Sequence, residues 1–160
     1  MAELTQIEEK LAEVMGLAQA AQGSTEKVGK LMEDEEIAGR LERMQQEAKE
    51  TEERCAKLAE TLDGKKTALQ EKARETKQEA EAMMKDYLGD DADALDGLEF
   101  LIMAEAGELG HVEIVGAMNE EIGQADIREL VDWALPIQER HFKETRDSAL
   151  KLAKAEASAT

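Results

Sequence analysis

Apolar residues recur every three to four positions along almost the whole chain, which is the period of an amphipathic helix. Turn-forming residues interrupt this pattern at 63–64, 89–91 and 122–124. A fourth candidate break, Gly23-Ser24, lies inside an unbroken apolar stripe, so we expect one long helix there that can bend at Gly23. The pattern predicts helices over residues 3–33, 36–62, 66–88, 92–121 and 125–157.

Short connections between long amphipathic helices make consecutive helices antiparallel neighbours. The apolar stripe of residues 66–88 is thinner than the others, which indicates a helix on the outside of the fold. The expected fold is therefore all-α, an antiparallel four-helix bundle with one extra peripheral helix. It forms a single domain over 1–157, and 158–160 are expected to be a disordered tail.

Composition agrees with helices and narrows the possible partners. The 160 residues include only four aromatic residues and one Pro, so strand-forming residues are scarce. The formal net charge of -18 argues against binding to nucleic acid or to an anionic membrane, although it attracts cations. No apolar run approaches the length of a membrane span, and the acidic start predicts no signal or transit peptide, so we expect a cytoplasmic protein. The lone Cys55 lies at an apolar helical position and is expected to be a core thiol.

Polar residues interrupt the apolar faces of the last two predicted helices. Glu105 falls in the middle of the buried arc of 92–121, Glu108 falls on its shoulder, and His111 continues round the same side. On 125–157, Gln138 falls at the centre of the arc and His141 within it. Counting outward from the hairpin between the two helices places Glu108 level with Gln138, and Glu105 level with His141. We therefore expect these side chains to converge in the interior.

The first two helices face this cluster with small residues, which leave room for long polar side chains or for an ion and water. These small residues are Ala18, Ala21, Thr25, Ala48 and Thr51. Gln22 also points inward, and Glu47 and Glu50 lie on the flank of the second stripe.

A buried carboxylate without a partner costs several kcal/mol, so it must be paired, protonated or metal-bound. Two interpretations of the cluster are open. Glu105, Glu108, His141 and His111 can be metal ligands. Alternatively, the same residues form a closed hydrogen-bond network without a metal, with His111 in a salt bridge at the outer edge and His141 a satisfied core imidazole. If these positions were exposed to solvent, neither interpretation would apply.

In segments 47–53, 105–113 and 133–142 the chain resembles the ferritin-like superfamily, most closely the small bacterial ferritin-like proteins associated with stress. In metal-binding members, two helices each give one Glu and two others each give a Glu-x-x-His pair to a di-iron or di-manganese centre. Glu108 and His111 match one such pair, whereas the residue three before His141 is Gln138, a neutral and poorer ligand. The second helix offers Glu47 and Glu50 but no His, and the first offers Gln22 where a Glu would be expected.

The resemblance implies a metal site built from a subset of six residues, with Gln138 and Gln22 orienting a ligand or bound water. The six are Glu105, Glu108, His111, His141, Glu47 and Glu50. Iron or manganese suits these donors, and zinc is a common substitute.

Two functions follow. The first is a ferritin-like protein that binds iron or manganese in a stress-related role. The second is a non-catalytic helical bundle that acts as an interaction or stress protein and carries no metal. The residues leave open whether the protein is an enzyme. An outer apolar set predicts either a homodimer contact or cover by the third helix: Phe100, Met103, Ile114 and Met118.

Overall fold

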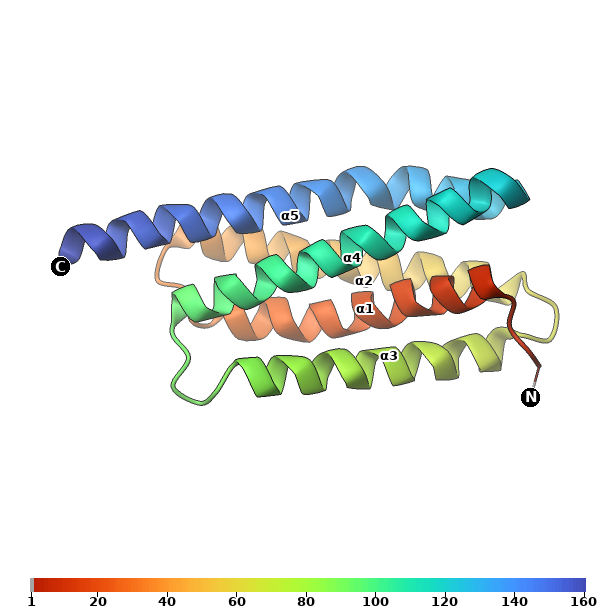
Figure 1. Ribbon diagram of the computed structural model, residues 1–160, viewed down its shortest axis with the longest axis horizontal. Coiled ribbons are helices and arrows are strands. Elements are labelled where there is room, and N and C mark those ends of the chain that lie inside the picture. Colours follow the sequence, from red (N-terminus) through yellow and green to blue (C-terminus); the bar gives the residue numbers. More distant parts are fainter. Residues whose placement is uncertain (1) are drawn as a thin grey trace.

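The computed structural model describes residues 2–160, which form five α-helices and no β-strand (Figure 1). The predicted all-α class is confirmed, and each predicted helix is present. The first helix runs unbroken through Gly23, and the last continues to Ala159, two residues past its predicted end. The helices are α1 (Gln6–Gly29), α2 (Glu35–Glu60), α3 (Lys66–Tyr87), α4 (Ala94–Ile122) and α5 (Ala125–Ala159).

Local hydrogen bonds fix where the helices begin and end. At the start of α1, the Thr5 side chain accepts a hydrogen bond from the Glu8 backbone N–H, and the Glu8 carboxylate accepts one from the Thr5 N–H. Asp93 and Asp96 form the same reciprocal pair at the start of α4. Gly123 ends α4 with a φ of 77°, a left-handed conformation that glycine adopts without strain. These caps fix the start of α1 and both ends of α4.

The chain reverses direction from each helix to the next (Figure 1). Helix α1 packs against α2, α3 and α4, while α5 packs against α4 and α2. Helix α3 lies on the side of the molecule opposite α5, where its main neighbour is α1. No helix within residues 2–160 is long and apolar enough to cross a membrane.

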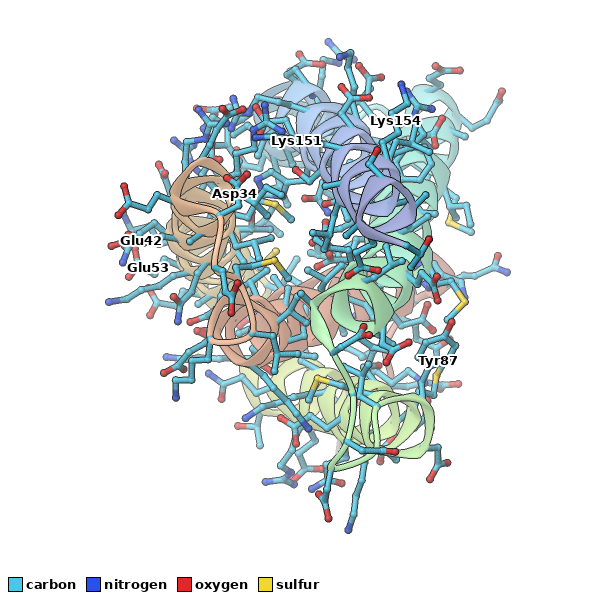
Figure 2. The ribbon with its side chains drawn as sticks, turned by 90° about the vertical axis from the view of Figure 1, so that its left-hand side faces the viewer. Asp34, Glu42, Glu53, Tyr87, Lys151 and Lys154 are labelled. Atoms are coloured by element: carbon cyan, nitrogen blue, oxygen red, sulfur yellow. The ribbon has the colours of Figure 1, made fainter. Side chains whose placement is uncertain are left out.

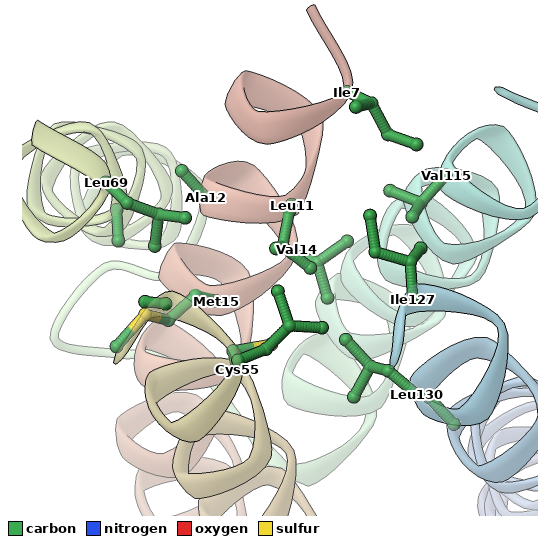
Figure 3. Close-up of a cluster of buried hydrophobic side chains, with 14 of the residues drawn as sticks. Ile7, Leu11, Ala12, Val14, Met15, Cys55, Leu69, Val115, Ile127 and Leu130 are labelled. Carbon is green, nitrogen blue, oxygen red and sulfur yellow. The ribbon is translucent and has the colours of Figure 1, made fainter. Parts of the chain in front are cut away.

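Two separate apolar clusters hold the helices together. One includes Leu11, Cys55 and Ile127 and joins the first half of α1 to the α4–α5 hairpin (Figure 3). The other includes Met44 and Leu101 and occupies the opposite end of the molecule. The stretches of α4 and α5 between these clusters carry the inward polar residues.

Helix α3 approaches α1 very closely at Gly16. A Cβ atom at Gly16 would lie 2.3 Å from the backbone oxygen of Ala73, a separation that real Cβ atoms do not show. Only glycine therefore allows α3 to sit at this distance from α1.

Candidate functional site

The inward polar residues of α4 and α5 form a buried layer. Glu105 is 1% exposed and His141 is 3% exposed, while Glu108 and Gln138 are also buried. The helical period alone predicted this burial, and the structure confirms it. We call these four residues, with Glu47 and Arg140, the polar core cluster.

His141 lies between two carboxylates from different helices. Its Nε2 is 3.1 Å from Oε1 of Glu47 on α2, and its Nδ1 is 3.7 Å from Oε2 of Glu105 on α4. Arg140, the preceding residue, donates a hydrogen bond to the other carboxylate oxygen of Glu47. Glu105 and His141 were expected to lie at the same level, and the structure brings them together and adds Glu47 of α2.

The protonation of this group follows from its neighbours. Burial disfavours the charged imidazole, but the carboxylates of Glu105 and Glu47 outweigh burial and raise the pKa of His141. Burial likewise opposes the charge on Glu47, but hydrogen bonds from Arg140 and His141 hold its pKa below the usual value. The contact between His141 and Glu47 is therefore stabilised as an imidazolium–carboxylate pair.

The pKa of Glu108 is shifted in the opposite direction from the pKa of Glu47. Burial, the negative charge of Glu105 and a hydrogen bond between the two carboxyl groups raise the pKa of Glu108 well above its usual value, and a hydrogen bond from Gln138 only partly offsets them. A protonated Glu108 can donate a hydrogen bond to Glu105. Glu108 and Gln138 were expected to lie at the same level, and the structure places both beside one small cavity.

The charges of the polar core cluster balance within the protein. Arg140 and the His141 imidazolium carry positive charge, Glu47 and Glu105 carry negative charge, and Glu108 is neutral when protonated. Two polar atoms of the cluster remain unsatisfied. One is Nε of Arg140, and the other is Oε2 of Glu105, which is buried and has no hydrogen-bond partner. Its nearest basic atom, Nδ1 of His141, is beyond hydrogen-bond distance.

Three of the five small residues that were expected to face the cluster do so, whereas Ala21 lines a different pocket and Thr25 bonds to the backbone of its own helix. Ala18, Ala48 and Thr51 line a cavity of about 10 Å³ beside Glu108 and Gln138. This is close to the smallest volume that holds one water molecule, on the order of 10–15 Å³. The long polar side chains occupy most of the space that the small residues leave.

Three of the predicted site residues lie away from the cluster. His111 turns toward α1, where its Nε2 is 3.2 Å from Oε2 of Glu13 and its Nδ1 is 2.8 Å from the backbone oxygen of Gly107. Glu50 is exposed on α2 and pairs with Arg54. Gln22 bonds to Glu52 and to the backbone of α1. For His111 the geometry is the predicted outer-edge salt bridge, and the Glu108–His111 spacing does not bring both side chains to one site.

Sequence reasoning missed two partners, Arg140 and Glu13. Arg140 lies one residue before His141 and therefore at the edge of the buried arc, from which a long side chain still reaches Glu47. Glu13 is one of many acidic residues on the chain, and no signal in the sequence singles it out as the partner of His111. Cys55 is fully buried, as expected, and burial raises the pKa of its thiol to about 12, which disfavours a reactive thiolate.

Within residues 2–160, no three His, Cys, Asp or Glu side chains are arranged to hold a metal ion. The fold and the cluster define an all-helical protein with a polar layer closed inside it. Comparison with protein-family models, curated proteins and solved structures finds no match to this chain.

Proposed function

We propose that this chain is a ferritin-like protein in which α1, α2, α4 and α5 form an antiparallel four-helix bundle and α3 is the extra peripheral helix. The order of contacts supports this arrangement, because α1 packs on α2, α2 on α5, α5 on α4 and α4 on α1. Ferritin-like bundles carry one long crossover between their second and third bundle helices. The segment that contains α3 occupies that place in the chain.

We propose further that the protein is non-catalytic and acts as an interaction or stress protein, with the polar core cluster as a metal-free hydrogen-bond network. The observation that carries this proposal is the position of His141 between Glu47 and Glu105, with Arg140 on the far oxygen of Glu47. A metal would require a neutral imidazole and free carboxylate oxygens. Here both imidazole nitrogens face carboxylates, and Glu47 is already paired with three cationic groups, Arg140, His141 and Arg43.

A second candidate function is the binding of iron or manganese, with zinc as a substitute. The unsatisfied Oε2 of Glu105 favours it, because a cation would satisfy this buried oxygen. Glu105, Glu108 and Nδ1 of His141 are the donors that would hold the ion. Their present arrangement does not form a three-ligand site.

Metal analysis of the full-length protein distinguishes the two functions. After anaerobic loading with Fe²⁺ or Mn²⁺ and desalting, we expect less than ~0.1 ion per chain and no change in melting temperature on adding a chelator. The matched variants are Glu105→Gln, in the cluster, and Glu113→Gln, exposed on the same helix. About one ion per chain that is lost in Glu105→Gln but kept in Glu113→Gln would establish the metal function instead.

A further inference from the structure

A groove runs along the outer side of the molecule between α3 and α4, with α1 as its floor. It encloses about 390 Å³. Leu17 and Ala21 form part of the floor, Met84 and Ala80 part of one wall, and Ala104 part of the other. We call this the α3–α4 groove. Glu108 of the polar core cluster also lines this groove, whereas the other members of the cluster do not.

The groove is about three helical turns long. Its α4 wall extends from Phe100 to His111, which at 1.5 Å per residue is about 16 Å. The ring of Phe100 packs against Tyr87 at one end, with the ring centroids 5.8 Å apart. At the other end the lining becomes polar, with the His111–Glu13 pair.

Apolar surface continues beyond the groove onto its lips. Met83 is 67% exposed, Met103 is 52% exposed, and Tyr87 and Ile114 are also exposed. Figure 2 shows Tyr87 on the side of the molecule where α3 and α4 face each other. In the predicted outer apolar set, Phe100 is buried, whereas Met103 and Ile114 are exposed. Helix α3 therefore covers only part of this face. The uncovered surface extends further than a small molecule seated in the groove would cover.

Gly107 has no side chain, so the α4 wall of the groove does not project at this position. A Cβ built at this position would have no atom within 4 Å, and the residue is exposed in the middle of a helix. Glycine in a helix interior costs about 0.5–1 kcal/mol relative to alanine, and no contact within the chain accounts for it here. An uncovered backbone at this point permits the close approach of another helix.

We propose that the α3–α4 groove binds one amphipathic helix of a partner protein, about three turns long, with Leu or Met side chains in the groove and Lys or Arg along its edges. Methionine-lined grooves adapt to apolar helix faces because the Met side chain is flexible and polarizable. The charge of the groove lining indicates that the partner helix is positively charged along its edges. The charged side chains lining the groove that are not buried include one lysine, Lys72, and three carboxylates, Glu13, Glu79 and Glu81. Glu13 and Glu81 are also paired with Lys10 and Lys77, but the net charge of -18 leaves the surroundings of the groove negative.

The same charge argument disfavours a second copy of this chain in the groove. Two chains of net charge -18 repel each other, and the groove of each has an excess of carboxylates. The predicted homodimer through this face is thus an alternative occupant that the experiment must separate. The inference rests on the proposed interaction role and specifies its partner. It is tested by a readout different from metal content, so either proposal can fail alone.

The experiment measures binding of a designed peptide to the full-length protein by fluorescence anisotropy. The probe is a labelled helix of about 14 residues made of Leu and Lys, with Leu at positions i, i+3, i+4, i+7 and i+11. We expect saturable 1:1 binding that weakens as salt is added. A peptide of the same composition with the Leu residues scattered, and one with Glu in place of Lys, should each bind at least about tenfold more weakly.

Two glycine variants locate the binding. Gly107→Phe fills the groove from α4, whereas Gly39→Phe places the same ring at an exposed glycine of α2 that also has nothing within 4 Å. Both variants should keep the helical circular dichroism of the parent. We expect Gly107→Phe to weaken peptide binding about tenfold or more and Gly39→Phe to leave it unchanged.

Three outcomes would overturn the proposal: no saturable binding of the Leu–Lys peptide, equal affinity for the scattered peptide, or equal affinity in Gly107→Phe. Sedimentation of the free protein tests the alternative occupant. A dimer that Gly107→Phe dissociates would show that a second copy fills the groove, and that result also rejects the partner helix.

Discussion

The inner and outer faces of helix α4 differ in which side chains find partners within the protein. Its inner face carries Glu105 and Glu108, which are buried beside His141 and Gln138 of α5. Its outer face carries Met103 and Gly107, which are exposed beside an apolar groove. The inner face has polar groups whose partners lie within the chain, and the outer face has apolar groups whose partners do not. The surface of α4 that lacks partners within residues 2–160 is therefore the outer one.

The largest expected effect comes from breaking the inner face at His141. In His141→Leu the Glu105 and Glu47 carboxylates lose the imidazole between them, and Glu105 becomes a buried charge without a partner. Removing one partner of a buried pair typically costs about 3–5 kcal/mol, so we expect the free energy of unfolding to fall by about 3 kcal/mol. Urea denaturation at neutral pH measures it.

The double variant His141→Leu/Glu105→Leu is the control for this prediction. Replacing both members of a buried pair with apolar residues removes the unpaired charge, so the double variant should recover a large part of the lost stability. A loss below about 1 kcal/mol in the single variant, or strictly additive losses in the double, would mean that the inner face is not a coupled network.

The next effect tests how α3 forms the wall of the outer groove. Gly16→Ala places a Cβ against the backbone oxygen of Ala73, and backbone cannot move aside as a flexible side chain can. Helix α3 must shift away from α1, and we expect a loss of about 2 kcal/mol in the free energy of unfolding, within the range for overpacking.

Gly23→Ala is the matched control, because it lies in the same helix with no atom within 4 Å of the added Cβ. It should raise the free energy of unfolding by up to about 1 kcal/mol. If the two alanine variants behaved alike, the close α1–α3 packing would be wrong, and with it the position of the groove wall.

The two faces also differ in how far the sequence predicts them. The pairings of Glu105 with His141 and of Glu108 with Gln138 were predictable, because the α4–α5 hairpin sets the register and each helix advances by a fixed rise and rotation. The period of a helix identifies its own buried arc. That arc was sufficient to place these four residues.

What the sequence could not predict is which neighbour each side chain at the edge of an arc meets. His111 lies about 60° round the helix from Glu108, which directs it toward α1 and Glu13 instead of toward α5. Glu47 reaches inward, whereas Glu50, one turn further, pairs with Arg54 at the surface. Such choices depend on how neighbouring helices are rotated, and the period of one helix carries no information about that rotation.

A smaller effect concerns the pH dependence that the inner face creates. The raised pKa of Glu108 means that the folded protein holds this proton more tightly than the unfolded chain does. Its contribution to stability is complete below the usual pKa of 4.5 and is lost as pH rises through the raised value. His141 has the same sign, with its contribution complete below 6.5 and lost above its raised pKa.

Glu108→Gln removes the first of these contributions while keeping a neutral amide beside Gln138. Relative to the parent, the variant should gain in the free energy of unfolding as pH rises from 5 to 8, because the parent loses the contribution of its buried carboxyl proton over this range and the variant has no such proton. Urea titrations at several pH values measure the gain. Glu113→Gln, exposed on the same helix, is the control, and an equal change of slope in both variants would contradict a buried proton at Glu108.

The smallest effect is expected at the other histidine, on the outer side of α4. His111 is 33% exposed, and its only ionic partner in residues 2–160 is Glu13, which itself also pairs with Lys10. Partly exposed ion pairs contribute little, so His111→Gln should change the free energy of unfolding by less than about 0.5 kcal/mol. Urea denaturation of His111→Gln and of His141→Leu directly compares two imidazoles that each contact a carboxylate. If His111→Gln cost as much as His141→Leu, contact with a carboxylate would matter more than burial, and the outer face would hold a second closed network. A small loss at His111 and a large one at His141 would instead show that burial makes the inner contact strong.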